Sequence, residues 1–415
     1  MTSEKQSNYR WYILAIATLT LSLVASAPRQ CMPVLFKEIS EDLGLDLVQV
    51  GTVWGMNALA GAVAGLLGGL VVDRFGIKRT LVTACLLIAI VIALRGFTWD
   101  FMSLSVAMFL FGIFASLVPK AGHKSSAIWF PSNRLGMANG ILSIGMTMGS
   151  MMGSMISATI LSPLLGGWRN VFFLYAAAPL VLSLLWLTTG REPHQVESSA
   201  EETGTAPFRT TLLRILRNKQ VWIIGIIQMG QMGAMQGANG YLPIYLRNIG
   251  WSPVTADSIM GIRSGVMTLF TIPMVMLSDR MGLRKGLLIP MLLSSGICLG
   301  LVPFFDGATL WALLILASLI RSGQMALFYS LITETEGIGG RYIGTAIGLT
   351  STVSQLGGFF APPLGNSLAL IEPGMPFIFW AGLSLVTLLG FFFIKERKRP
   401  KTGHPGDAIM PAVDG

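Results

Sequence analysis

The sequence is built from long apolar segments separated by short polar stretches. A helix of about 20 apolar residues crosses the roughly 30 Å of hydrocarbon in a bilayer, so each such segment predicts one transmembrane helix. Hydrophobic residues make up 53% of the chain and charged residues only 12%. We therefore predict an all-α polytopic membrane protein with twelve transmembrane helices near residues 11–35, 48–72, 81–97, 103–127, 137–162, 170–188, 221–246, 254–278, 286–305, 309–331, 343–369 and 375–394.

The distribution of the 29 Lys and Arg residues predicts the orientation of the chain. With the N-terminus inside, the cytoplasmic segments hold 21 of them and the outer loops four, namely Lys37, Arg95, Arg169 and Arg247. Because cytoplasmic loops carry the excess of Lys and Arg, we expect both termini in the cytoplasm and the inner membrane of a bacterium as the location. The net charge of +9 then favours contact with anionic membrane lipids, and no nucleic-acid partner is expected.

A polar central stretch divides the chain into two halves of six predicted spans each. We expect an N-terminal six-helix bundle at 1–190, a cytoplasmic linker with an amphipathic helix at 191–220, a C-terminal six-helix bundle at 221–395 and a cytoplasmic tail at 396–415. Asp73 and Asp279 are 206 residues apart in similar loops, so the second bundle is predicted to repeat the first. Internal duplication of this kind is a recurrent design of secondary transporters.

The loop after the second predicted span reads GLVVDRFGIKR, residues 69–79, and its repeat reads VMLSDRMGLRK, residues 275–285. The first copy fits the loop signature of the major facilitator superfamily, which the chain resembles over about residues 10–398, and the second fits except at Val275. The resemblance implies that these loops latch the cytoplasmic side when the transporter opens outward. The residues expected to act as this gate are Gly69, Asp73, Arg74, Gly76, Asp279 and Arg280. The alternative, a basic anchor beside the membrane, leaves the Asp and Gly residues unexplained.

Glycines recur at four-residue spacing in two predicted spans. Gly145, Gly149 and Gly153 lie in the fifth span, and a similar set surrounds Gly344 at the start of the eleventh. We interpret both sets as helix-packing positions, because small residues let membrane helices approach closely.

Four basic residues lie inside predicted spans: Arg29, Lys120, Arg263 and Arg321. All 20 acidic residues fall in loops, tails or span ends, and the two nearest a core, Asp257 and Glu334, are the candidates for proton coupling. Arginine binds carboxylates bidentately and keeps its charge, so the buried cations predict an anionic substrate. For the arginines the alternative is a structural pair with a carbonyl or helix end, and for Lys120 it is snorkelling to the inner face.

Polar side chains on neighbouring spans complete the predicted binding set. Asn57 occupies the position in the first half that Arg263 occupies in the second. In the seventh span polar side chains recur at helical spacing, and from this stripe and its end we select Gln231, Asn239 and Tyr241. Hydrogen bonding between helices is an equally open explanation of the stripe.

Two further resemblances concern the substrate. The segment APRQCMPVLFKEI, residues 27–39, is similar to the first span of the monocarboxylate transporters, in which a basic residue follows a proline. WFPSNRLGMANG, residues 129–140, and YLPIYLRNIGWSP, residues 241–253, look more like the nitrate and cyanate permeases. Both resemblances imply an anionic substrate, and they differ on whether it is organic.

We therefore expect an alternating-access secondary transporter of a small anion, an organic carboxylate in the first place, driven by protons or by exchange against a counter-anion. The alternatives are an inorganic anion permease of the nitrate or cyanate type, a drug exporter, which the missing core carboxylate disfavours, and a sensor that binds without transport. No enzymatic activity, cofactor or metal site is expected, because the sequence has no metal cluster, nucleophile–base set or phosphate-binding loop.

Overall fold

The computed structural model describes residues 3–190, 215–281, 284–333 and 343–394, and in these ranges the chain is helical, with no β-strand. Twelve helical stretches run across the molecule, six in each half. The spans of the first half are α1 (Ser3–Thr20) with η1 (Leu21–Ser26) and α2 (Ala27–Leu43); α3 (Leu47–Phe75); α4 (Ile77–Gly96); α5 (Phe101–Ala115) with α6 (Leu117–Trp129); α7 (Ser132–Ile156) with η2 (Ser157–Leu161) and α8 (Ser162–Leu165); and α9 (Trp168–Thr189). Those of the second half are α11 (Lys219–Asn248); α12 (Pro253–Met281); α13 (Arg284–Leu301) with η3 (Val302–Phe304); α14 (Gly307–Arg321) with α15 (Gln324–Thr333); α16 (Ile343–Ser367) with η5 (Leu368–Leu370); and α17 (Met375–Thr387) with η6 (Leu388–Phe393).

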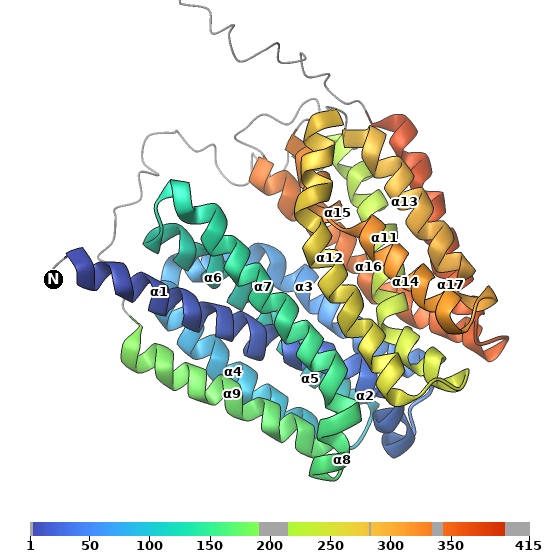
Figure 1. The fold of residues 1–415 in the computed structure, drawn as a ribbon, viewed down its shortest axis with the longest axis horizontal. Helices are drawn as coiled ribbons and strands as arrows, with labels where there is room; N and C mark the ends of the chain where they lie inside the picture. The colour runs from blue at the N-terminus through green and yellow to red at the C-terminus, as the bar shows by residue number, and fades with distance from the viewer. Residues whose placement is uncertain (1–2, 191–214, 282–283, 334–342, 395–415) are drawn as a thin grey trace, which may run out of the picture.

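The two halves form two helical bundles that lie side by side (Figure 1). The predicted architecture of twelve helices in two related bundles is confirmed. Within the described residues, nine of the twelve stretches are long and apolar enough to cross a membrane by composition alone. Of the other three, α11 and α16 carry more polar side chains, and α11, α12 and α16 all pack against the first half.

The two ends of the bundle differ in charge. One end, here called the basic end, carries Arg74, Lys78, Arg79, Lys124 and Arg134 around the α3–α4 and α6–α7 junctions. The opposite end, here called the acidic end, contains the α2–α3, α4–α5, α11–α12 and α13–α14 connections and is rich in Asp and Glu.

Carboxylates at the acidic end cap several of the helices that start there. Asp100 and Asp306, separated by the same 206 residues as Asp73 and Asp279, precede α5 and α14 and accept hydrogen bonds from backbone N–H groups of the first turn. Hydrogen bonds from the Trp251 indole and the Gly307 amide hold the pKa of Asp306 below its usual value. The same capping device therefore starts the fourth span of both halves.

The first span is not a regular helix. It changes to a π-helical turn over Leu21–Ser26, where the Ala27 N–H donates to the Ser22 carbonyl, and Pro28 follows at the start of α2. Proline has no N–H to donate, so the two features together free backbone carbonyls in the middle of the span. This is the stretch that carries Arg29.

The glycines of α7 pack directly on the backbone of this irregular span. A Cβ at Gly149 would overlap the Ser22 carbonyl oxygen, and one at Gly153 would overlap the Ala27 carbonyl oxygen. The same seam continues at Gly145 against Thr18. By contrast, a Cβ at Gly140 near the basic end of α7, or at Gly344 of α16, would meet no atom within 4 Å.

Contacts between the halves lie at the acidic end and the middle of the bundle. The main helix pairs that form them are α2 with α11, α3 with α16, and α7 with α12, and α3 also contacts α11. At the acidic end Asn366 donates to the Leu47 carbonyl at 2.7 Å, and near the middle the Thr147 and Thr268 hydroxyls join α7 to α12. Beyond this bond α7 and α12 separate toward the basic end (Figure 1).

We expect Gly149→Ala to destabilise the protein by about 1–3 kcal/mol, because the added methyl group must push apart two helices whose backbones are in contact. The measurement is the thermal unfolding midpoint of the purified protein in detergent. Gly140→Ala is the matched control in the same helix, and it should leave the midpoint unchanged or raise it, since alanine favours helix more than glycine does. Equal midpoints for the two variants would contradict this account of the seam.

Candidate functional site

Two predicted cations of the second half meet around one serine. Arg263 on α12 donates from Nε to the Ser318 hydroxyl at 3.0 Å, and Arg321 is the last residue of α14, one turn after Ser318. Arg321 donates from Nη2 to the Gln231 carbonyl at 3.5 Å, and its electrostatic environment includes the charge of Arg263. Neither arginine has a carboxylate partner within the described part of the chain.

Arg321 lies at a break in the fourth span of its half. Ser322 is extended, with ψ of 138°, and Gly323 has φ of 75°, a conformation that residues with a side chain rarely adopt. The helix resumes as α15 at Gln324. In the first half the corresponding span is interrupted at Ser116, again 206 residues earlier. Interrupted helices of this kind form the binding sites of many transporters.

A small cavity opens beside Arg321. Its volume is about 40 Å³, and its wall combines Gln228, Gln324 and Ser354 with the apolar side chains of Met232, Met235, Met325 and Phe328. The side-chain nitrogen of Gln228 is sealed beside it and has no hydrogen-bond acceptor among the described residues. An unpaired buried amide is costly, so a rotation of this side chain toward an acceptor in the cavity would be favourable.

The structure separates the polar residues of α11 into two roles. The Gln231 side chain, predicted to bind substrate, donates to the Ser384 carbonyl at 2.9 Å and accepts from the Ser384 hydroxyl at 2.9 Å. Gln231 therefore joins α11 to α17, and Gln228 takes the position beside Arg321. Tyr241 packs against Phe377 and donates to a backbone carbonyl, whereas Asn239 remains partly exposed.

The first half contributes Arg29 from α2. Its guanidinium is half-buried and lies 6.0 Å from the Trp54 ring, within the range of a cation–π contact. Among the described residues Arg29 has no hydrogen-bond or carboxylate partner. Trp54 in turn donates to the Gln236 carbonyl of the other half at 2.8 Å, and Asn57, almost one turn further along α3, packs on α5 at Gly112.

Lys120 has a different environment from the arginines. Its ammonium group donates to the Ala64 carbonyl at 3.1 Å and to the Gly65 carbonyl at 2.9 Å, so it joins α6 to α3. The side chain is partly exposed, and it lies in the basic half of its span. Its ammonium is therefore satisfied by backbone in this conformation.

Sequence reasoning missed a fifth cation in the interior. Arg95, expected in an outer loop, lies in the last turn of α4 and is 0% exposed. Its guanidinium lies 4.0 Å from the Phe111 ring and donates to the Pro28 carbonyl at 2.9 Å, next to Arg29. The Asp100 cap could have revealed this, because it limits the α4–α5 loop to residues 97–100. Two guanidinium nitrogens of Arg95 are closed off from solvent and have no hydrogen-bond partner in the described part of the chain, which is not the case for Arg29, Arg263 or Arg321.

A second residue expected in an outer loop is also buried. Arg247 at the end of α11 forms an ion pair with Asp257 of α12, in which Nη2 donates to both carboxylate oxygens at 2.7 and 2.9 Å, and the two side chains are 8% and 0% exposed. Asp257 also accepts from Thr159 of the first half at 2.7 Å. Asp257, a candidate for proton coupling, therefore forms both an ion pair and a hydrogen bond between the halves at the acidic end.

The predicted gating residues lie at the basic end. Gly76 joins α3 to α4 with φ of 79°, and Arg74 is exposed. Gly69 and Asp73 are in the last turns of α3, and Asp279 and Arg280 are in the last turn of α12. The surroundings of these four positions, and the whole of Glu334, lie outside the described residues.

Comparison with known proteins agrees with this architecture. The family model described as Major Facilitator Superfamily matches residues 14–267 and 224–410. The chain belongs to the major facilitator superfamily. As a member of it, the protein is an integral membrane transporter and not an enzyme.

Individual relatives cover nearly the full chain at low identity. One is "Probable nitrate/nitrite antiporter NarK1" of Thermus thermophilus, 25% identical over 94% of this chain and 92% of that protein. Another is the "Cis,cis-muconate transport protein" of Acinetobacter baylyi, 24% identical over 94% of this chain and 96% of that protein. Among solved structures, the nucleoside transporter NupG superposes with a TM-score of 0.76 at 18% identity, covering 93% of this chain and 99% of that one. This last similarity shows the fold alone.

We expect Asp257→Asn to lower stability by about 3–5 kcal/mol, the cost of leaving one partner of a buried ion pair unpaired. The unfolding midpoint in detergent measures it. The double variant Asp257→Leu with Arg247→Met removes both charges and should recover most of the loss. A single variant that unfolds at the wild-type temperature would show that the pair does not hold this end together.

Proposed function

We propose that this protein is an alternating-access secondary transporter of a small anion, and that the anion is an organic carboxylate. The observation that carries the proposal is the state of Arg29, Arg263 and Arg321. All three are half-buried, none has a carboxylate partner among the described residues, and none has a nitrogen that is both sealed and unpaired. Their free N–H groups are therefore available to a ligand, and only a ligand that carries negative charge offsets the cost of desolvating them.

The cavity beside Arg321 fits one anionic group of the substrate. A carboxylate there accepts from the Arg321 guanidinium, and it also accepts from the Gln228 amide once that side chain turns its sealed nitrogen into the cavity. Neither donor has a strong partner among the described residues. A volume of about 40 Å³ holds a group of a few atoms and not a whole organic acid. The rest of the substrate then extends from this cavity, with Arg263 and Arg29 placed to act on it.

The contacts between the halves support alternating access. The helix pairs that touch do so at the acidic end and the middle, where Asp257, Trp54 and Asn366 connect the halves. By the distribution of basic residues, the opposite, basic end faces the cytoplasm. The described conformation is thus closed to the outside, and the reverse state requires the acidic-end contacts to break while the basic ends of α7 and α12 come together.

The coupling mode is proton symport or anion exchange. Asp257 and Glu334 are the carboxylates nearest the core, and Asp257 is held by Arg247 in this conformation. Protonation of Asp257 would weaken that pair and its contact with Thr159, which gives a route from an outer proton to the opening of the outer side. Exchange against a counter-anion needs no such carboxylate, because the incoming anion restores the charge balance at the arginines.

An inorganic anion is the second candidate. It is favoured by the small volume of the Arg321 cavity and by the similarity to the nitrate/nitrite antiporter, which covers 94% of this chain. The similarity to the muconate transport protein has the same coverage and favours an organic acid. Bacterial relatives also support a bacterial inner membrane as the location.

A ligand panel separates these candidates. The purified protein is heated with monocarboxylates, dicarboxylates, nitrate, cyanate or cationic drugs, and a ligand that binds the folded state raises the unfolding midpoint. We expect carboxylates to stabilise the protein and cationic drugs to have no effect. Stabilisation by nitrate alone would select the inorganic candidate, and stabilisation by cations alone would overturn the proposal.

Gln228→Leu should separate binding from folding at the proposed site. Its buried amide nitrogen has no acceptor in the free protein, so its removal should leave the unliganded midpoint equal or higher. The affinity for the stabilising anion should fall by about 0.5–1.5 kcal/mol, the net value of one hydrogen bond. A fall in stability with unchanged affinity would mean that Gln228 serves the fold instead.

Arg321→Lys and Arg263→Lys keep the charge but lose the planar bidentate geometry, so each should weaken anion binding by about 1–3 kcal/mol. The measurement is the affinity by calorimetry for the ligand found in the panel. Arg169→Lys is the matched control, because it makes the same change at a partly exposed arginine of the acidic end that pairs with Asp42, and it should leave affinity close to wild type. Wild-type affinity in a stable Arg263→Gln variant would exclude Arg263 from the site.

A further inference from the structure

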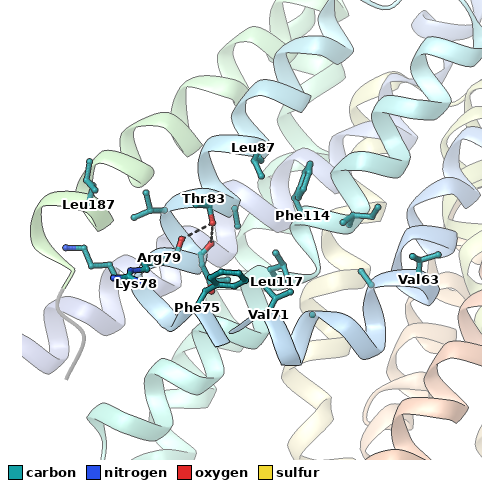
Figure 2. Close-up of a pocket in the computed structure, with 16 residues that line it drawn as sticks. Val63, Val71, Phe75, Lys78, Arg79, Thr83, Leu87, Phe114, Leu117 and Leu187 are labelled. Carbon is teal, nitrogen blue, oxygen red and sulfur yellow. Dashed lines mark hydrogen bonds between the residues drawn. The ribbon is translucent and has the colours of Figure 1, made fainter. Parts of the chain in front are cut away.

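The first half contains an apolar pocket far larger than the cavity beside Arg321. Its volume is about 720 Å³, and it lies near the basic end between α3, α4, the fourth span and the end of α9 (Figure 2). That volume lies within the range of pockets that bind small molecules. None of Arg29, Arg263 and Arg321 lines it, so the proposed anion site does not account for it.

The pocket opens on the surface that faces the hydrocarbon of the membrane. Val63, Phe75 and Leu87 line it and are 50%, 51% and 38% exposed. The Thr80 and Thr83 hydroxyls in its wall donate to carbonyls of their own helix at 2.6 and 2.8 Å. Because these hydroxyls already have acceptors, the pocket interior offers only apolar side chains to a ligand. A molecule that fills the interior must itself be apolar.

One edge of the pocket is strongly basic. Lys78 and Arg79 line it there, opposite Val63 (Figure 2), and both belong to the first turn of α4. Neither has a carboxylate partner among the described residues. The N-cap residue of α4 is Gly76, which has no side chain to cap the first turn, and the N–H groups of that turn add positive potential at the same place. The pocket therefore joins an apolar interior to an anion-attracting edge.

We propose that this pocket binds an anionic phospholipid of the leaflet at the basic end, with an acyl chain in the apolar interior and the phosphate against Lys78 and Arg79. The membrane is the solvent at this depth, and a phospholipid is the component that combines a long apolar chain with a negative group at the interface. Leu117 of α6 also lines the pocket, so the lipid lies against the helix that carries Lys120, a predicted site residue. The inference does not depend on which substrate is transported.

The experiment compares phosphatidylglycerol with phosphatidylcholine, which have similar chains and differ in net charge. The detergent-purified protein is incubated with an equal mixture, and native mass spectrometry counts the lipids that remain bound. We expect phosphatidylglycerol to be retained several-fold over phosphatidylcholine and to raise the unfolding midpoint. Lys78→Gln with Arg79→Gln should remove most of this preference, so that the two lipids are retained about equally.

Two further variants keep the test specific. Arg217→Gln with Lys219→Gln removes the same charge from the basic end of the other half, where both side chains are exposed, and it should retain the wild-type preference. Thr83→Trp places a ring in the pocket from an exposed position and should reduce retention of both lipids while the lipid-free midpoint stays near wild type. Wild-type retention in the Lys78/Arg79 variant, or equal losses in the Arg217/Lys219 variant, would overturn the proposal, as would undiminished retention in Thr83→Trp.

Discussion

A charged side chain in the middle of a bilayer costs about 2.5–3.5 kcal/mol on insertion, so every interior cation of this chain needs a compensating environment. Arg247 has Asp257, and Lys120 has two backbone carbonyls. Arg95 has the Pro28 carbonyl and the face of Phe111, which give only part of what a guanidinium needs. Arg29, Arg263 and Arg321 have the fewest protein groups that offset their charge, and their guanidinium groups are the most accessible. This difference separates the structural cations from those available to a ligand.

The irregular first span connects these cations. The Pro28 carbonyl, just after its π-turn, binds Arg95, and the next residue along the chain is Arg29. Glycines of α7 pack on the same stretch so closely that no side chain fits between the helices. A distortion that weakens the helix is thus held from two sides, and Arg29 projects from a segment whose backbone is fixed by Arg95 and by α7.

The architecture could be predicted from the sequence because it rests on periodic and repeated signals. Apolar segments, the 206-residue repeat and charged residues within spans all persist over many positions. Arg95 and Arg247 were placed wrongly because a shift of one helical turn decides whether an arginine near a span end is buried, and composition does not resolve one turn. Gln228 and Gln231 lie three residues apart on one helix, and only the position of Ser384 on α17 shows that Gln231 is engaged and Gln228 is not.

The polar character of α11 and α16 bears on how the molecule is assembled. Composition alone does not mark the described residues of these two spans as membrane-crossing, and each packs on a helix of the first half. The ribosome completes α2 and α3 before it makes them, and domains made first can fold first. The N-terminal bundle therefore offers a finished protein surface on which the less apolar spans can bury their polar faces, so that the later helices leave the insertion machinery toward a partner and not toward lipid alone.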